Sequence, residues 1–226
     1  AAQRKTDGRT PLHISLAPYE SEVIAFTDRQ LPPTVDAPAL AKPIDLSSGW
    51  SVKFDQPLKG TDFQPTSQNM DKLVSWTDND KTKNFSGTAT SEKTLTIDPA
   101  TAGAAAVIDF GQGKPSGERG GQGYHAALDA PVRDVAVVTV NGKRAGAVFS
   151  PPYRVDITGL LKPGENQLSI QVANTSVNAI AAKPYPTYDY EGVNRVYGNR
   201  FQPQGMEVLS APLPSGLLGP VTIQSK

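Results

Sequence analysis

The feature that most constrains this chain is a series of short, strand-like segments joined by turns of defined chemistry near its middle. Residues 135–140 are almost all β-branched and lead into Asn141-Gly142, a dipeptide that tolerates the positive φ angles of a two-residue hairpin. Further on, Pro151-Pro152 prevents ladder hydrogen bonding, and the turn sequence at 162–166 precedes the alternating segment 167–173. Consecutive strands and tight turns of this kind predict a piece of a β-sandwich.

Composition limits the kinds of fold and binding partner that this chain can have. The 22 basic and 22 acidic residues cancel, so net charge favours neither nucleic acid nor an anionic membrane surface, and a neutral partner such as a sugar fits better. No run approaches the roughly 20 apolar residues that a membrane-spanning helix needs. The absence of cysteine excludes a disulfide framework, a thiolate metal site and a cysteine nucleophile. The 20 Gly and 20 Pro residues predict many short strands and little helix, with at most a single turn at 99–106.

The chain divides into three parts. Residues 1–29 contain two short alternating pieces and are predicted to form a β-hairpin, the remnant of a preceding β-sandwich domain. Residues 30–43 are rich in proline and read as an extended linker. Residues 44–226 are predicted to form two packed sheets. The strands are expected at 50–54, 85–97, 105–110, 132–140, 146–149, 154–157, 167–173 and 221–223.

Four parts of the sequence carry a resemblance to a known family. They are GWSVKF at 49–54, LVSWT at 73–77 with NFSGTAT at 84–90, PPYRVDIT at 151–158 with LKPGEN at 161–166, and SGLLGPV at 215–221. The third is similar to jelly-roll sandwiches of the galactose-binding type, as in glycoside hydrolases of the family 2 type. The second and fourth together resemble more narrowly the C-terminal region of bacterial α-L-rhamnosidases of glycoside hydrolase family 106. Over about residues 44–226, the resemblance implies an all-β jelly-roll β-sandwich, galactose-binding-domain-like, with an N-terminal β-hairpin appendage.

The resemblance also implies a function. In that family an upstream barrel domain of the same polypeptide holds the catalytic carboxylates, so this chain is expected to be a non-catalytic accessory or carbohydrate-binding fragment. The parent activity would be hydrolysis of terminal α-L-rhamnosides, the ligands rhamnose-containing glycans, and the location periplasmic or secreted in a bacterium, with the signal peptide outside this chain. Two departures stand out: a glycine-rich insertion at 113–123, and a family Asn-Arg-Leu-Ile-Gly-Asp pattern of which only Asn178 is present.

Catalytic candidates are few. A glycosidase needs two carboxyl groups about 5 to 10 Å apart. Only Asp189 and Glu191 lie among aromatic residues, and on a strand they would face the same side, although a solvated loop is the favoured interpretation. His13 and His125 are too few for a histidine metal site and match no nucleophile motif. A glycine-rich phosphate loop at 111–123 is disfavoured because no Lys-Ser/Thr pair follows it.

No cofactor is certain. Sandwiches of this group often hold a structural calcium ion through backbone carbonyls and an acid, which leaves little trace in a sequence. The candidate donors are Asp109, Asp156 and Glu207.

Aromatic residues give the candidate carbohydrate site. Trp50 and Trp76 lie in strand-like motifs and are predicted to be core residues, with Trp50 on the same face as Val52 and Phe54. The long segment 184–213 lacks periodicity and mixes tyrosines with hydrogen-bonding side chains, a mixture that suits both sugar stacking and an interdomain interface. Its candidate carbohydrate-binding residues are Tyr185, Tyr188, Tyr190, Asn194, Arg195, Tyr197 and Arg200.

Three alternatives to an accessory carbohydrate-binding domain stay open from the sequence. One is a stand-alone carbohydrate-binding module, and another is a structural domain that buttresses a catalytic barrel without binding sugar. The third is an intact small enzyme.

Overall fold

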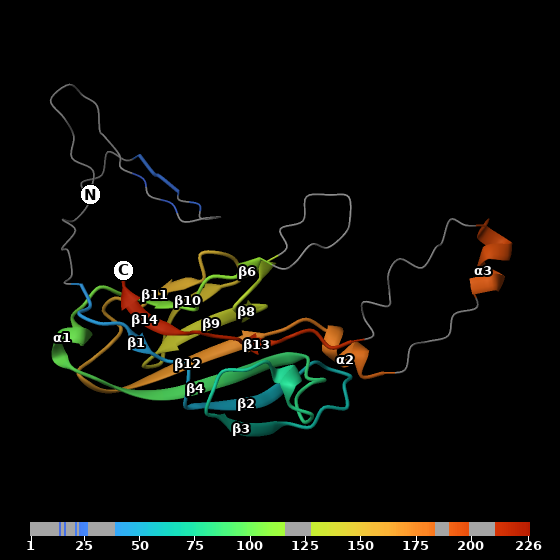
Figure 1. The fold of residues 1–226 in the computed structure, drawn as a ribbon, viewed down its shortest axis with the longest axis horizontal. Helices are drawn as coiled ribbons and strands as arrows, with labels where there is room; N and C mark the ends of the chain where they lie inside the picture. The colour runs from blue at the N-terminus through green and yellow to red at the C-terminus, as the bar shows by residue number, and fades with distance from the viewer. Residues whose placement is uncertain are drawn as a thin grey trace.

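Two antiparallel sheets form the body of the molecule (Figure 1). The computed structural model describes residues 14, 16, 21, 23–26, 39–115, 128–183, 190–198 and 211–226. The larger sheet has the strand order β10-β9-β12-β4-β2-β3, and the smaller one β1-β14-β5-β11. The larger comprises β2 (Trp50–Pro57), β3 (Thr66–Met70), β4 (Gly87–Ile97), β9 (Val135–Val140), β10 (Lys143–Val148) and β12 (Gly164–Ala173). The smaller comprises β1 (Ile44–Asp45), β5 (Ala106–Asp109), β11 (Arg154–Asp156) and β14 (Thr222–Ser225).

Short elements complete the described structure. Two further two-residue pairs join β13 (Gly216–Leu217) to β8 (Val132–Arg133) and β6 (Lys114–Pro115) to β7 (Leu128–Asp129). The helical pieces are the 3-10 turn η1 (Trp76–Asp78), α1 (Pro99–Ala102), α2 (Val177–Ala181) and α3 (Tyr190–Tyr197). The single helical turn predicted at 99–106 is confirmed, and Asp98 caps it by accepting hydrogen bonds from the amides of Ala100 and Thr101.

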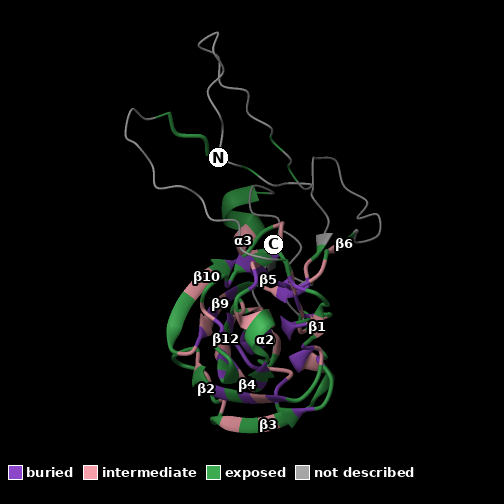
Figure 2. Cartoon of the chain, turned by 90° about the vertical axis from the view of Figure 1, so that its left-hand side faces the viewer, coloured by how far each residue is buried: buried purple, intermediate pink, exposed green. Residues whose placement is uncertain are grey.

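Side-chain alternation builds the core. On β2, Trp50, Val52 and Phe54 are buried while the residues between them are more accessible, and β12 buries alternate residues in the same way. The buried hydrophobic residues of both sheets belong to one cluster, and Figure 2 marks the buried residues in purple along the strands. The predicted fold class, an all-β jelly-roll sandwich, is therefore confirmed.

The hairpin predicted at Asn141-Gly142 is also confirmed. Asn141 has φ 51° and Gly142 has φ 78°, and Val140 pairs with Lys143 across the turn. The side-chain Nδ2 of Asn141 donates to the carbonyl of Leu160 (3.0 Å) and to Oδ1 of the buried Asn166 (2.8 Å). These bonds tie the turn to the 162–166 loop, so two turns predicted separately support each other.

The sandwich starts a few residues before the predicted boundary at Ile44. Ala39 forms a parallel bridge with Ala105, and Leu40 is buried in the core. The Leu40 amide donates to Oγ of Ser225 (2.8 Å), which donates in return to the Leu40 carbonyl (3.2 Å). The end of the predicted 30–43 linker is thus part of the folded body.

Most of the predicted N-terminal hairpin lies outside the described residues. The described ones, Ile14, Leu16, Ser21 and 23–26, are exposed and carry no strand pairing, so the hairpin stays a prediction. Within the part of the chain that the structure covers, no helix has the length and apolar character needed to span a bilayer.

Candidate functional site

The predicted carbohydrate-binding residues are described only in part. Tyr185, Tyr188 and Arg200 lie outside the described residues, and Tyr190 begins α3 with its side chain undescribed. Asn194, Arg195 and Tyr197 are exposed on α3. The 184–213 segment was expected to lack regular structure, yet α3 lies within it. The sequence did not predict this helix because about two helical turns are too short to show a clear hydrophobic period. Sugar binding by these side chains stays a prediction.

The alternative in which Asp189 and Glu191 face the same side of a strand, disfavoured from the sequence, does not match the structure at Glu191. Glu191 lies in the first turn of α3 and is exposed, while Asp189 lies outside the described residues. A helical Glu191 lacks the strand geometry on which that alternative depended. The observation removes the one sequence-based reason for a catalytic pair.

Both tryptophans are core residues, as predicted. Trp50 is 1% exposed and its indole Nε1 donates to the Leu46 carbonyl (2.6 Å). Trp76 is 2% exposed and packs edge-on against Phe54 and Phe85 at ring-centroid distances of 5.2 and 5.5 Å. Neither indole is therefore available as a broad stacking platform.

A buried hydrogen-bond network fixes both ends of the 184–210 segment to the sandwich. Asn178 of α2 is 2% exposed. Its side-chain Nδ2 donates to the Leu213 carbonyl (3.0 Å), and its Oδ1 accepts from the Leu213 backbone amide (2.7 Å). It also donates to Oγ of Ser215 (2.9 Å), as does Asn174 (3.0 Å). The Ser215 amide in turn donates to Oγ of Ser75 (3.0 Å). The family-like Asn178 and the SGLLGPV motif thus meet in one structural anchor.

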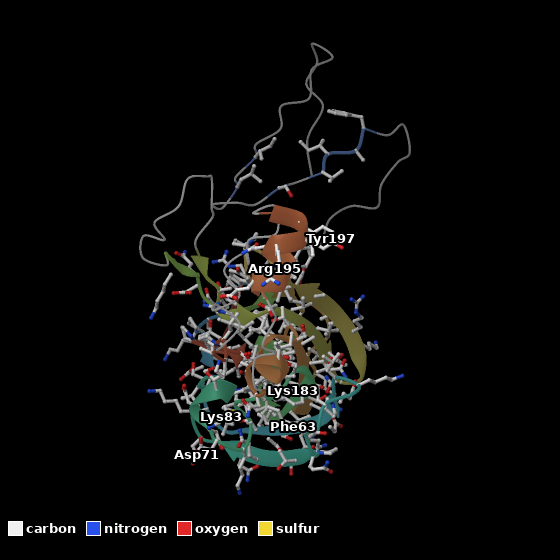
Figure 3. The ribbon with its side chains drawn as sticks, turned by 90° about the vertical axis from the view of Figure 1, so that its right-hand side faces the viewer. Phe63, Asp71, Lys83, Lys183, Arg195 and Tyr197 are labelled. Carbon is white, nitrogen blue, oxygen red and sulfur yellow. The ribbon has the colours of Figure 1, made fainter. Side chains whose placement is uncertain are left out.

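A cleft of about 610 Å³ opens beside this anchor, at the end of the sandwich that Figure 3 faces. Three segments that are separate in sequence form it: the β2–β3 loop, residues 80–84 after η1, and α2 with the residues that follow it. Phe63 lines the cleft and is half-buried, with its ring centroid 4.9 Å from that of Phe85 and 6.5 Å from that of Phe54. The aromatic core therefore fixes the orientation of the Phe63 ring at the cleft wall.

Some polar side chains at the cleft have an ion-pair or hydrogen-bond partner among the described residues, and others do not. Lys83 pairs with Asp80 at 2.8 Å, and this hydrogen bond and charge hold the pKa of the Asp80 carboxyl below its usual value. Lys81 and Lys183 also line the cleft, but neither ammonium has a carboxylate within 4.0 Å among the described residues. The side chain of the half-buried Asn84 makes no hydrogen bond to that part of the chain either. The cleft thus presents an aromatic ring, the carboxamides of Asn84 and Gln64, and two lysines without an ion pair among the described residues, beside the carboxylate of Asp62.

The candidate calcium donors have other partners in the described structure. Asp109 accepts from Nε of Arg154 (2.7 Å) and from the Gly111 amide (2.7 Å), which occupies both oxygens. Burial favours a higher pKa for Asp156, but hydrogen bonds from Lys226 (2.5 Å) and Thr158 outweigh it, so the pKa is lowered. Glu207 lies outside the described residues, among which no group of three acidic or histidine side chains could hold a metal ion. A calcium ion held by backbone carbonyls and a single acid needs no such group, so the calcium site stays a prediction.

Sequence reasoning missed the cleft. Its walls come from polar loops, and Phe63 is an isolated aromatic residue between Asp62 and Gln64 with no periodic context. The one sequence signal near the cleft was the 184–213 segment, predicted as a candidate carbohydrate site, which follows α2 directly. The cleft lies at the base of that segment, since Lys183 is its last lining residue.

Two of the known proteins that this chain resembles are a relative in sequence and a protein of solved structure. No family model matches the chain. It is 26% identical over 183 residues to a putative β-glucuronidase of Formosa agariphila, a match that covers 80% of this chain and 13% of the relative. The solved structure of a rhamnosidase from Novosphingobium sp. PP1Y matches with a TM-score of 0.53 and 26% identity, over 88% of this chain and 16% of the rhamnosidase.

The chain is similar to parts of glycoside hydrolases. It spans less than a fifth of the length of either relative, so the activity of a whole relative does not transfer to it directly. The predicted resemblance to a domain of a glycoside hydrolase is therefore confirmed.

Proposed function

We propose that this chain is a non-catalytic accessory β-sandwich of an α-L-rhamnosidase-like glycoside hydrolase of family 106. In this proposal its parent enzyme cleaves terminal α-L-rhamnosides with an upstream barrel domain, acts on rhamnose-containing glycans, and works in the periplasm or outside a bacterial cell. The observation that carries the proposal is the likeness to the Novosphingobium rhamnosidase, which extends over 88% of this chain in both fold and sequence.

The described chemistry supports a non-catalytic role. Glycoside hydrolysis needs two carboxyl groups on either side of the scissile bond, and the general acid needs a raised pKa. The described carboxyl groups with a shifted pKa, Asp45, Asp80, Asp98 and Asp156, are all shifted downward, which keeps them ionised rather than ready to donate a proton. None of them has the property that a general acid requires.

A hydrolysis assay tests the proposal. The purified 226-residue chain is expected to show no turnover of aryl α-L-rhamnosides or aryl β-D-glucuronides above a buffer blank, measured by release of the chromogenic leaving group. Turnover that follows the protein through purification and disappears in Glu191→Gln would overturn the non-catalytic assignment.

A role as a structural buttress is the second candidate. Phe149 is 70% exposed at the end of β10, and Val23 and Phe26 in the N-terminal segment are 94% and 90% exposed. Single exposed apolar side chains are common on protein surfaces, and in the buttress proposal these three would be covered by a neighbouring domain. A buttress that binds no sugar would show no response in the titrations described next.

A further inference from the structure

We infer that the cleft around Phe63 is a binding site for an acidic saccharide, a hexuronate-type pyranose unit of a glycan. Resting on the proposed function, the inference places the sugar site beside Lys183, just before the tyrosine-containing 184–213 segment, and changes the expected ligand from a neutral sugar to an anionic one.

The shape and the aromatic wall suit a pyranose. A volume of about 610 Å³ lies within the range of small-ligand sites, which is roughly 300 to 1,000 Å³. Phe63 packs on Phe85 and Phe54 on its inner side and lines the cleft with the rest of its surface. A ring held in place in this way offers a stacking surface for the C–H face of a sugar without losing side-chain freedom on binding.

The lysines of the cleft lining favour a negatively charged ligand. Lys83 neutralises Asp80, so the remaining charged groups of the lining are Lys81, Lys183 and Asp62, with an excess of one positive charge. The whole chain, by contrast, carries no net charge. A carboxylate bound between Lys81 and Lys183 would gain charge-assisted hydrogen bonds, and the Asn84 side chain, which makes no hydrogen bond to the described residues, can bond to hydroxyl groups.

Small side chains keep the site open. Ala179 and Ala182 form the α2 side of the cleft. The Ala179 amide donates to Oγ of the buried Ser86 (3.0 Å), which fixes the start of α2 against the sandwich. A bulky residue at 182 would fill space that the ligand needs, while leaving the Asn178 anchor intact.

Titration with D-glucuronate tests the inference, with D-glucose as the uncharged counterpart. We expect a dissociation constant nearer millimolar than micromolar, with amide NMR shifts at 61–66, 80–84 and 179–183 that shrink as NaCl is raised. Phe63→Ala should weaken binding about fivefold, and Lys81→Gln and Lys183→Gln about threefold each. Ala182→Trp should abolish the response.

Matched controls lie away from the cleft. Phe149→Ala removes an exposed ring and Lys143→Gln an exposed cation outside the cleft lining, and neither should change the affinity. The two lysine variants are surface changes that leave the aromatic cluster intact, so they remain informative even if Phe63→Ala loosens the fold.

The outcomes separate this inference from the proposed function. Equal affinity for glucose and glucuronate, or full affinity in both lysine variants, would overturn an acidic-saccharide site. Shifts produced by L-rhamnose at 190–198 alone would also overturn the cleft, yet they would support the proposed accessory role. Absence of any response at high millimolar sugar would overturn the cleft and favour the buttress, while the hydrolysis assay would still stand as the test of a non-catalytic chain.

Discussion

At the scale of single residues, Gly216 shows why the SGLLGPV motif has its glycine. Its φ is +97°, and a Cβ added there would lie 2.4 Å from Nε1 of Trp76. Trp76 is buried against Phe54 and Phe85 and cannot move aside without disturbing the aromatic cluster. The close approach of β13 to the indole therefore requires a residue without a side chain.

Gly216→Ala is expected to lower the free energy of unfolding by about 3 kcal/mol, because backbone strain and a steric clash with Trp76 add together. Gly60→Ala is the matched control, since Gly60 has φ +83° but nothing within 4 Å of an added Cβ. It should cost only about 1 kcal/mol, from strain alone. Chemical denaturation of both variants measures the difference, and equal losses would mean that the Trp76 contact is unimportant.

At the scale of elements, Asn178 joins α2 to the residues that lead into β13. Its side chain makes three hydrogen bonds to Leu213 and Ser215, and it is almost fully buried. Removal of a buried amide leaves the partner groups unsatisfied, which costs more than the bonds themselves contribute. The anchor therefore holds the residues on the two sides of the intervening segment together.

Asn178→Ala is expected to destabilise the protein by about 2 to 3 kcal/mol and to increase hydrogen exchange first at 177–183 and 211–217. Asn69→Ala serves as the control, because Asn69 is exposed on β3 and its side chain makes no hydrogen bond to the described residues. Exchange that rises uniformly over the whole sandwich would show that Asn178 contributes to global stability and is not a local anchor.

At the scale of the whole molecule, the N-terminal boundary of the sandwich is set by Leu40. This residue fills the core and exchanges two hydrogen bonds with Ser225 of β14, next to the C-terminus. Residues 39 and 40 therefore contact the smaller sheet where β5 begins and β14 ends, although they lie within a proline-rich stretch.

A chain that begins at Ala39 is expected to unfold cooperatively with the stability of the full chain, whereas one that begins at Ile44 should lose about 2 kcal/mol by exposing the Leu40 pocket. Thermal denaturation followed by circular dichroism compares them. If the chain starting at Ala39 has no cooperative transition, the first 38 residues are an integral part of the fold.

The sequence by itself determined the features that depend on neighbouring residues. The turn at Asn141-Gly142 follows from local φ preferences, and the core faces of β2 and β12 follow from alternation, because both are encoded within a few positions. β3 was missed because its sequence TSQNM is polar and lies at the edge of the sheet, where burial imposes little pattern.

Only the tertiary structure decided the candidate site. Phe63, Asn84 and Lys183 are far apart in sequence and come from two loops and the end of α2. The contact of Gly216 with Trp76 and the anchor at Asn178 likewise join distant segments. Such sites depend on which loops the two packed sheets bring to the same end, and this long-range arrangement leaves no period or motif in any single stretch of the chain.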